Sequence, residues 1–563
     1  MKYIYLLILS FYSVIILSQN KYPQHYFEAP LKIPIYLSGT FGELRSNHFH
    51  SGIDIKTQGK EGIPIYAPAD GFVSRIKVKQ YGFGKALYID HPNGFTTVYA
   101  HLKKYAPKIQ EYVKKTQYEK QSYYTGNLFP SEDKFPVKKG DLIGFTGNSG
   151  SSGGPHLHYE IRDTKTEHII NPLLFGLTVK DDIKPIIKNL YAFPLNDNAR
   201  INKACKKTII PIKKIDSGLY KANTTNANGL IGFGIETYDQ QNGTYNKNGI
   251  YSLEMQVNGT RVYYHDVETF SFAESKYINL LIDYETYGKH KKRIQKTHKV
   301  DANPLSLYKD LIDAGKITIS NSENYMIEII AKDILGNTST LKIPIRGVDN
   351  NTLITKKDTT NFKINAKAFN TFTQKGVTIA FPKNTFYSDC FIDFSVEDSI
   401  AKIHEPIIPL DKKYTLTFDT SNLSYEQKQQ VYIANVTKPK KEYYATTKKR
   451  DTKVFTNTKS LGSYRLKFDK KSPTITPLNF KNEQNLNVLK TLQVKINDDE
   501  SGINEFNAFI DNEWILMEYN HKKGILTYDF SDKMLVGYKH IFKLVVSDNV
   551  GNTEETELTF YRN

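Results

Sequence analysis

The stretch from Gly144 to Glu160, GFTGNSGSSGGPHLHYE, leads from a glycine- and serine-rich turn into a strand-like H-L-H-Y-E segment. His156 and His158 alternate on the expected strand, so both imidazole rings leave the same face and stand side by side. Leu157 and Tyr159 point the other way, into packing. The stretch therefore predicts a β-strand that presents two imidazoles together.

Short β-type runs broken by glycines surround this stretch, between about residues 35 and 177. They cover residues 63–67, 71–78, 86–90, 96–101, 142–146 and 156–162. Glycine turns at short intervals, with no long helical period, predict a compact antiparallel β domain. A polar, Tyr- and Lys-rich insertion at about 107–134 interrupts this domain. We expect the insertion to be helical in part, over 109–120, and to form a wall of the cleft or to cover it.

Two further clusters carry residue types suited to chemistry. The first is His50-Ser51-Gly52-Ile53-Asp54, where a histidine and an aspartate four positions apart can reach one metal ion if Gly52 permits a bend. The second is Tyr99-Ala100-His101-Leu102, at the end of an expected strand. Each cluster alone is weak, because a single histidine is more often structural than a ligand.

Together, and in this order, the three clusters make the chain similar to the lysostaphin-type (LytM-like) zinc endopeptidases. The similarity covers residues 39–172 and includes Arg45, the run PIYAPADG at 64–71, the run GDLIG at 140–144 and Asn171-Pro172. Two features depart from the family pattern without removing a ligand: the long insertion after the second cluster, and the doubled glycine before Pro155.

The resemblance implies a role for five residues. His50, Asp54 and His158 match the family's zinc ligands, and His101 and His156 match its two catalytic histidines. Three protein ligands leave the fourth tetrahedral position of a Zn²⁺ ion open for water, which the metal activates as the nucleophile. The two catalytic histidines would assist proton transfer and stabilise the oxyanion, and the pattern does not say which does which.

Four neighbouring residues are weaker candidates for a role at the metal site. His48 shares a side with His50 if that segment is extended, and so could reach the metal. Glu160 faces the same side as His158 and could orient a ligand. We expect His91 to be a turn residue and His168 to lie on the surface.

Beyond residue 178 the chain stays rich in strand patterns but poor in catalytic residue types. The segments Asp333–Thr338 and Asp548–Thr553 repeat the pattern D-x-x-G-N-T between apolar runs, which is typical of a hairpin turn. We expect a mainly β protein: a signal peptide at 1–18, the peptidase domain at 19–178, Ig-like β-sandwiches at 179–348 and 471–563, and a β-rich domain of open class at 349–470.

Length and composition set the class of protein. The chain has 563 residues, 39% of them hydrophobic and 24% charged, which is typical of a globular multidomain protein. Lys2 followed by the apolar run from Tyr3 to Leu17 resembles a secretory signal peptide, although an uncleaved anchor is the alternative. We expect no stable membrane span after cleavage. The net charge of +17 then favours acidic cell-wall polymers over nucleic acid.

The two cysteines, Cys205 and Cys390, are expected in different domains as separate buried thiols. They offer no zinc-thiolate site, so the metal depends on histidine and carboxylate ligands.

The sequence thus predicts an exported, periplasmic or extracellular zinc endopeptidase that hydrolyses the peptide cross-links of bacterial peptidoglycan. Two other classes stay open: a catalytically silent LytM-like regulator of other cell-wall hydrolases, and a wall-binding adhesin-like protein. The Ig-like domains of the peptidase would serve targeting, spacing or regulation of access, through a regulatory or targeting partner.

Overall fold

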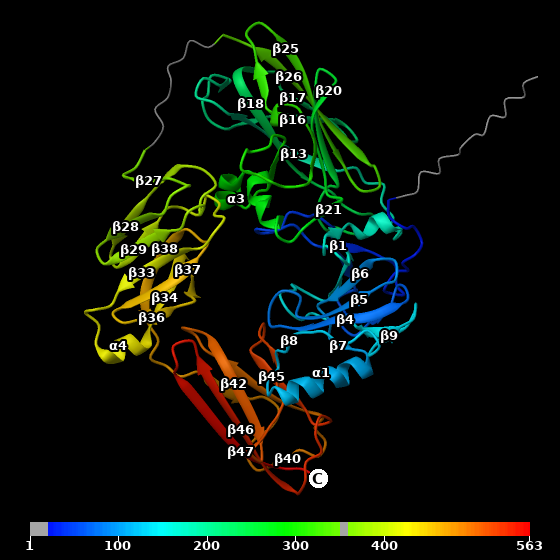
Figure 1. Ribbon diagram of the computed structural model, residues 1–563, viewed down its shortest axis with the longest axis vertical. Coiled ribbons are helices and arrows are strands. Elements are labelled where there is room, and N and C mark those ends of the chain that lie inside the picture. The colour runs from blue at the N-terminus through cyan, green and yellow to red at the C-terminus, as the bar shows by residue number, and fades with distance from the viewer. Residues whose placement is uncertain (1–20, 350–358) are drawn as a thin grey trace, which may run out of the picture.

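Four β-rich domains follow one another around a ring, and the fourth returns to contact the first (Figure 1). The structure, a computed structural model, describes residues 21–349 and 359–563, so the expected signal peptide lies outside the described residues. We call residues 21–178, 179–348, 359–470 and 471–563 the first to fourth domains. None of the helices in these described ranges is long and apolar enough to cross a membrane.

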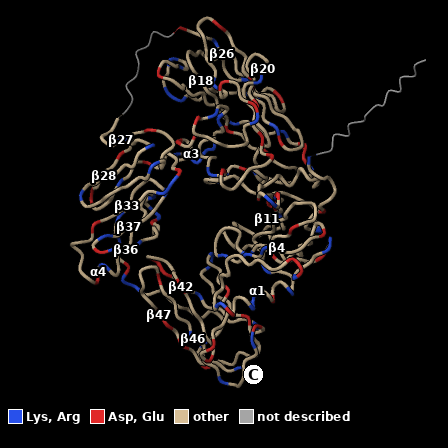
Figure 2. Tube along the Cα trace, in the orientation of Figure 1, with Lys and Arg blue, Asp and Glu red and all other residues tan. Residues whose placement is uncertain are grey.

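Charged residues are interleaved along the whole chain. Figure 2 shows Lys and Arg beside Asp and Glu in all four domains. Some of these charges pair within a domain, as Lys207 and Asp283 do, and others pair between domains, as Lys276 and Asp411 do. The positive net charge is therefore spread over the chain.

The first domain consists of a large and a small antiparallel sheet, which confirms the predicted fold class. The path of the large sheet is β1 (Leu37–Gly39), β2 (Ile53–Lys56), β11 (His156–Asp163), β6 (Phe95–Ala100), β5 (Lys85–Asp90), β4 (Gly71–Val78) and β8 (Gly126–Leu128). The small sheet holds β3 (Pro64–Tyr66), β10 (Leu142–Phe145) and β7 (Lys104–Tyr105), and β9 (Pro136–Val137) pairs with β4.

The insertion is helical in part, as the sequence predicts. Its helix α1 (Pro107–Glu119) begins with a proline, whose missing N–H is not needed in the first turn. Ile109, Val113 and Gln117 recur every four residues and form the buried face of the helix. The chain then returns as β8, which pairs with β4 at the edge of the large sheet.

The second domain completes the hydrophobic core of the first. Strand β12 (Ile169–Ile170) pairs with β21 (Thr269–Phe270), so the large sheet continues into the second domain. The Phe270 ring lies 4.9 Å from that of Phe41 and 5.3 Å from that of Phe49. The boundary at residue 178 therefore divides the chain but does not divide the core.

A fragment that ends at residue 178 should be much less stable than one that ends at residue 348. Without the second domain, Phe41 and Phe49 become exposed, and each costs about 1.5–3 kcal/mol of burial. Urea unfolding of the two fragments, followed by circular dichroism, measures this difference. Equal midpoints for both fragments would show that the first domain folds on its own core.

The second domain is a branched 13-stranded arrangement. Its main path is β15 (Thr208–Ile210), β13 (Ile186–Pro194), β18 (Thr225–Tyr238), β26 (Thr338–Gly347), β25 (Asn324–Lys332), β19 (Ser252–Val257), β20 (Thr260–Asp266) and β23 (Tyr308–Leu311). The side strands are β14 (Arg200–Ile201), β16 (Ile212–Asp216), β17 (Leu219–Ala222), β22 (Ile294–Lys296) and β24 (Ile317–Ile319), and the short helices are α2 (Ile278–Leu281) and α3 (Tyr284–His290). The predicted hairpin around Asp333 is present as β25 and β26.

The third and fourth domains each have two main sheets around one core. Both sheets have five strands in the third domain, and the fourth domain has one sheet of four strands and one of five. In the third domain these are β28 (Asn370–Gln374), β29 (Val377–Phe381), β33 (Tyr414–Asp419), β37 (Lys453–Thr458) and β36 (Lys448–Arg450), against β31 (Phe394–Glu397), β32 (Ile400–Ile403), β38 (Gly462–Phe468), β34 (Val431–Lys438) and β35 (Lys441–Ala445). Strand β27 (Phe362–Ile364) pairs with β30 (Cys390–Ile392), and α4 (Tyr425–Gln430) precedes β34.

In the fourth domain, β39 (Thr474–Pro477), β41 (Thr491–Asn497), β45 (Ile525–Asp529) and β44 (Glu518–Asn520) form one sheet. The other holds β40 (Gln484–Asn485), β47 (Thr553–Tyr561), β46 (Lys539–Asp548), β42 (Ile503–Ile510) and β43 (Glu513–Trp514). The repeated hairpin around Asp548 is present as β46 and β47. An immunoglobulin-like strand order for the second and fourth domains stays a prediction.

The cysteines lie in different domains and are unpaired, but only one of them is shielded from solvent. Cys205 is exposed, which corrects the expectation of a buried thiol, because it lies in a turn after β14. Cys390 is half-buried in β30, and burial raises its pKa to about 11.

Candidate active site

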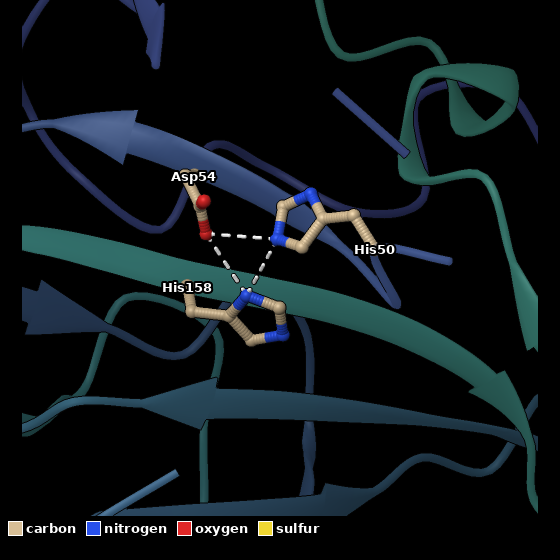
Figure 3. Close-up of side chains that lie close together, drawn as sticks. All are labelled: His50, Asp54 and His158. Atoms are coloured by element: carbon tan, nitrogen blue, oxygen red, sulfur yellow. Dashed lines mark hydrogen bonds and ion pairs between the residues drawn. The ribbon is translucent and has the colours of Figure 1, made fainter. Parts of the chain in front are cut away.

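Three ligand atoms, from β2, from β11 and from the segment just before β2, converge on one point (Figure 3). Asp54 and His158 are direct partners in the register of β2 and β11, and His50 precedes β2. His50 Nε2 lies 3.0 Å from Asp54 Oδ1 and 3.1 Å from His158 Nδ1, and the last two atoms are 2.9 Å apart. Ligands about 2.1 Å from zinc in a tetrahedron lie about 3.4 Å from one another. The triangle therefore has nearly the size of a zinc ligand set.

The remaining ring nitrogens are held by hydrogen bonds that orient both histidines. His50 donates from Nδ1 to the Thr40 carbonyl at 2.8 Å, which leaves Nε2 for a metal. His158 donates from Nε2 to Glu160 Oε1 at 3.0 Å, which leaves Nδ1. Such partners fix the tautomer and the ring plane of metal-binding histidines. The donor set and its orientation fit a zinc ion.

Asp54 is the electrostatic centre of the site. Burial would raise its pKa, but contacts with His50, His156 and His158 outweigh burial and hold the pKa of Asp54 well below its usual range. Its second oxygen, Oδ2, accepts a hydrogen bond from Arg45 at 3.2 Å. The carboxylate is therefore ionised and ready to bind a cation.

Glu160 orients His158 through a hydrogen bond, which is the role that the sequence suggested for it. Burial would raise the pKa of Glu160, but Arg162 and His158 hold it at about 2, so the carboxylate stays charged. Arg162 donates from Nε to Glu160 Oε2 at 2.7 Å. Burial would lower the pKa of His158, but its hydrogen bonds to Asp54 and Glu160 raise it to about 9 in the metal-free protein.

The two candidate catalytic histidines lie next to this triangle. The rings of His101 and His156 are 4.9 Å apart, and His156 Nε2 lies 3.3 Å from Asp54 Oδ1. His101 donates from Nδ1 to the Ser149 carbonyl at 2.9 Å, and His156 donates from Nδ1 to the Gly154 carbonyl at 2.8 Å. In both rings the backbone contact holds Nδ1, so Nε2 is available for chemistry.

His101 has an uncommon backbone conformation. It follows β6 with φ at 61°, in the left-handed region where histidine is one of the more tolerated residues. Strained backbone of this kind gathers at functional sites. Burial, with His158 and His156 nearby, lowers the pKa of His101 to about 3.

Gly52 is needed for close packing of the two strands that carry the ligands. A Cβ atom at this position would lie 2.3 Å from the Tyr159 carbonyl oxygen in β11. The glycine thus lets β2 approach β11 next to Asp54 and His158.

Replacing Gly52 with alanine should push β2 away from β11 and weaken both zinc binding and folding. We expect a loss of about 1–3 kcal/mol in the free energy of unfolding, as for other overpacked sites. Gly153→Ala is the matched control, because a Cβ there would meet nothing within 4 Å. Zinc content and denaturant unfolding of both variants are the measurements, and an unaffected Gly52→Ala protein would contradict this role.

The other histidines of the domain lie outside the triangle. His48 is exposed and bonds from Nδ1 to the Ser46 carbonyl, so it is no part of the ligand cluster. His91 is buried, with its two ring nitrogens bonded to the Asp70 carbonyl and to Thr97 Oγ1. His168 is exposed, as predicted.

Some supporting residues were missed from the sequence. Ser149 lies within the run that ends at Glu160, and Arg162 lies two residues after that run. Their closeness in sequence to His156 and His158 could have indicated a supporting role. Phe83, whose ring lies 5.2 Å from that of His158, comes from a loop without such a signal.

The fourth domain forms one wall of a groove beside His101. The groove has a volume of about 370 Å³ and contains Ser149, Tyr123 and Tyr124 from the first domain and Glu518 from the fourth. Ion pairs and ring contacts fix this wall: Lys85 Nζ lies 3.0 Å from Glu518, and the Tyr118 ring of α1 lies 5.5 Å from that of Trp514. Lys522 donates to the Asn148 carbonyl at 2.6 Å. The insertion and the fourth domain together therefore border this groove, which reaches Ser149, the residue whose carbonyl accepts a hydrogen bond from His101.

Comparison with known proteins finds two family matches in the chain. Residues 48–127 match peptidase family M23, and residues 361–469 match a Zu5-like domain. The DD-carboxypeptidase/endopeptidase Mpg of Neisseria meningitidis is 36% identical over 119 residues, which are 21% of this chain and 21% of that protein. The peptidoglycan DD-endopeptidase ShyC of Vibrio cholerae is 33% identical over 99 residues, 18% of this chain and 17% of that protein.

The cell division protein DipM of Caulobacter vibrioides is 26% identical over 160 residues, 28% of this chain and 20% of that protein. Each match spans about a fifth of the length of the relative. Among solved structures, the catalytic domain of lysostaphin from Staphylococcus simulans is 22% identical, with 24% of this chain and 87% of that one covered and a TM-score of 0.18, which is too low to support an assignment.

The fold and the ligand triangle of the first domain agree with those matches to metallopeptidases. Its residues 48–127 match peptidase family M23, which confirms the resemblance to the LytM-like family that the sequence motifs indicated. The domain of open class at 349–470 is similar to Zu5-like domains.

Proposed function

We propose that this chain is an exported zinc-dependent endopeptidase that hydrolyses the peptide cross-links of bacterial peptidoglycan. The observation that carries the proposal is the triangle of His50 Nε2, Asp54 Oδ1 and His158 Nδ1 within a domain that matches peptidase family M23. Imidazole nitrogen and carboxylate oxygen are zinc ligands. When bound, zinc would polarise the scissile carbonyl and activate a water molecule for attack.

The chain's own residues would handle the protons. Burial lowers the pKa of His101, which favours the neutral imidazole at pH 7, and its Nε2 would take part in proton transfer. His156 holds Nε2 next to Asp54 Oδ1, at the edge of the triangle. Both rings lie beside the triangle, where they would assist proton transfer and stabilise the oxyanion. These roles support hydrolysis of an amide bond.

The groove beside His101 suits a peptide strand with acidic groups. Lys79 and Lys103 line it together with Tyr123, Tyr124 and the ion pair of Lys85 with Glu518. Lysines attract carboxylates, and tyrosine rings provide flat apolar surface with a polar edge. Two of the relatives are named as a DD-carboxypeptidase/endopeptidase and a peptidoglycan DD-endopeptidase. These names support direct peptide cross-links of peptidoglycan as the substrate.

Turnover of purified peptidoglycan tests the proposal against its two alternatives. The zinc-loaded chain should release soluble fragments from sacculi, a chelated sample should not, and added zinc should restore release. A silent regulator would bind zinc without releasing fragments, but would increase release by another hydrolase. An adhesin-like protein would bind sacculi and leave them intact. Either of these two results would contradict the proposed activity.

A further inference from the structure

Two clusters of three aspartates lie outside the first domain. One consists of Asp181, Asp239 and Asp333 in the second domain. The other consists of Asp469, Asp498 and Asp548 in the fourth domain. Within each cluster, one carboxylate oxygen from each residue lies within 4.8 Å of the others. We call them the second-domain cluster and the fourth-domain cluster.

The second-domain cluster ties the incoming chain to the repeated hairpin. Asp181 lies five residues before the first strand, β13, and Asp333 follows β25. Asn337 of the hairpin donates from Nδ2 to Asp333 Oδ2 at 2.7 Å and to the Asp181 carbonyl at 3.1 Å. Asp239 follows β18 and completes the cluster.

The fourth-domain cluster repeats this construction. Asp469 lies five residues before β39, and Asp548 ends β46. Asn552 donates from Nδ2 to Asp548 Oδ2 at 2.7 Å and to the Asp469 carbonyl at 3.2 Å. Asp498 follows β41. The same set of groups is thus built twice, each time where the chain enters a domain.

Unpaired oxygens in the second-domain cluster point to a missing partner. Asp239 and Asn248 are each 3% exposed, and Oδ1 of each accepts no hydrogen bond. The two residues form an isolated β-bridge and line a cavity of about 30 Å³ with Asp181 and Asp333. A cavity of this size holds one water molecule or one ion. Buried oxygens without a donor are costly, and a cation would satisfy them.

The fourth-domain cluster has a similar unpaired oxygen. Ser501 is 1% exposed, and its Oγ has no hydrogen-bond partner. Its backbone N–H donates to Asp469 Oδ2 at 3.0 Å, so the residue lies directly beside the cluster.

Neutral groups are the hydrogen-bond partners of these carboxylates in the described chain. Asp333 accepts from the N–H groups of Leu335 and Asn337, and Asp498 accepts from those of Glu500 and Gly502. Such donors do not balance three negative charges.

We propose that each cluster is a calcium site that fixes the chain where it enters the second and the fourth domain. Calcium binds six to eight oxygen ligands from carboxylates, amides, carbonyls and water, in flexible geometry. Three carboxylates with an amide or hydroxyl oxygen provide such a set. The second-domain site lies against Phe41 and Asn171 of the first domain, because both line the same cavity. The fourth-domain site holds the domain that borders the groove.

Calcium titration of the zinc-loaded full chain by calorimetry tests this proposal. We expect two calcium ions per chain, with dissociation constants of about 10⁻⁴–10⁻³ M, as in extracellular modules. Asp239→Asn and Asp498→Asn should each reduce the number to one, and the double variant should bind none. The melting temperature should rise with calcium in the wild type and not in the double variant.

The matched controls are Asp182→Asn and Asp499→Asn. Each removes the same charge from an exposed residue next to a cluster member, so both should keep two calcium ions. The melting curves show whether each variant is folded, independently of hydrolysis. No calcium binding by the wild type at about 10 mM, or unchanged stoichiometry in the cluster variants, would overturn the proposal. Equal binding of magnesium would overturn the choice of calcium.

Discussion

Asp54→Ala should lose its zinc and its hydrolytic activity together. Asp54 Oδ1 contacts both histidine ligand atoms, at 3.0 Å from His50 Nε2 and 2.9 Å from His158 Nδ1. Without it the site keeps two ligands, which is too few to hold a zinc ion firmly. We expect less than one tenth of the wild-type zinc per chain and activity at the level of the chelated protein. Metal analysis and peptidoglycan release measure the two effects in parallel.

Asp133→Ala is the matched control for this experiment. Asp133 lies in the insertion of the same domain and is exposed, so the same change there should leave zinc and activity intact. Circular dichroism of both variants separates loss of metal from loss of folding. Full zinc occupancy in a folded Asp54→Ala protein would refute the ligand assignment.

His101→Ala and His156→Ala should keep their zinc and lose most of their activity. Neither side chain belongs to the ligand triangle, while both rings lie beside it. A positioned proton-transfer group contributes about 10²–10⁴-fold to a rate, and we expect each variant to lose that factor. Initial rates on a soluble muropeptide, with metal analysis of the same samples, give both quantities.

His168→Ala serves as the control, since His168 is an exposed histidine of the same domain. It should match the wild type in rate and in zinc content. His156 Nε2 lies 3.3 Å from Asp54 Oδ1, close enough to be a ligand itself. If His156→Ala released its zinc, His156 would be a metal ligand and its assignment as a catalytic residue would be wrong.

Much of the first domain could be predicted from local sequence. The strand expected at 71–78 is β4 with the same bounds, and the one expected at 156–162 is β11 with one more residue. Glycine turns and β-branched runs determine these elements locally. The alternation of His156 and His158 also placed both rings on one face, because the side-chain period of a strand is two.

The rest depends on contacts between residues far apart in the chain. Phe270 completes the core of the first domain, and Trp514 packs on Tyr118 of the insertion. No local pattern encodes such packing. Gly52 lies at a bend, as the sequence suggested, but its close approach to the Tyr159 carbonyl could not be predicted. The two aspartate clusters each unite residues far apart in sequence, so only their hairpin aspartates carried a visible signal.

The most direct test of the central claim is incubation of the zinc-loaded chain with a defined, cross-linked muropeptide dimer, followed by mass spectrometry of the products. The account predicts that the dimer is converted into two monomers whose summed mass exceeds that of the dimer by one water molecule, and that the Asp54→Ala protein leaves the dimer unchanged. An intact dimer after incubation with folded, zinc-loaded wild-type protein would contradict the account.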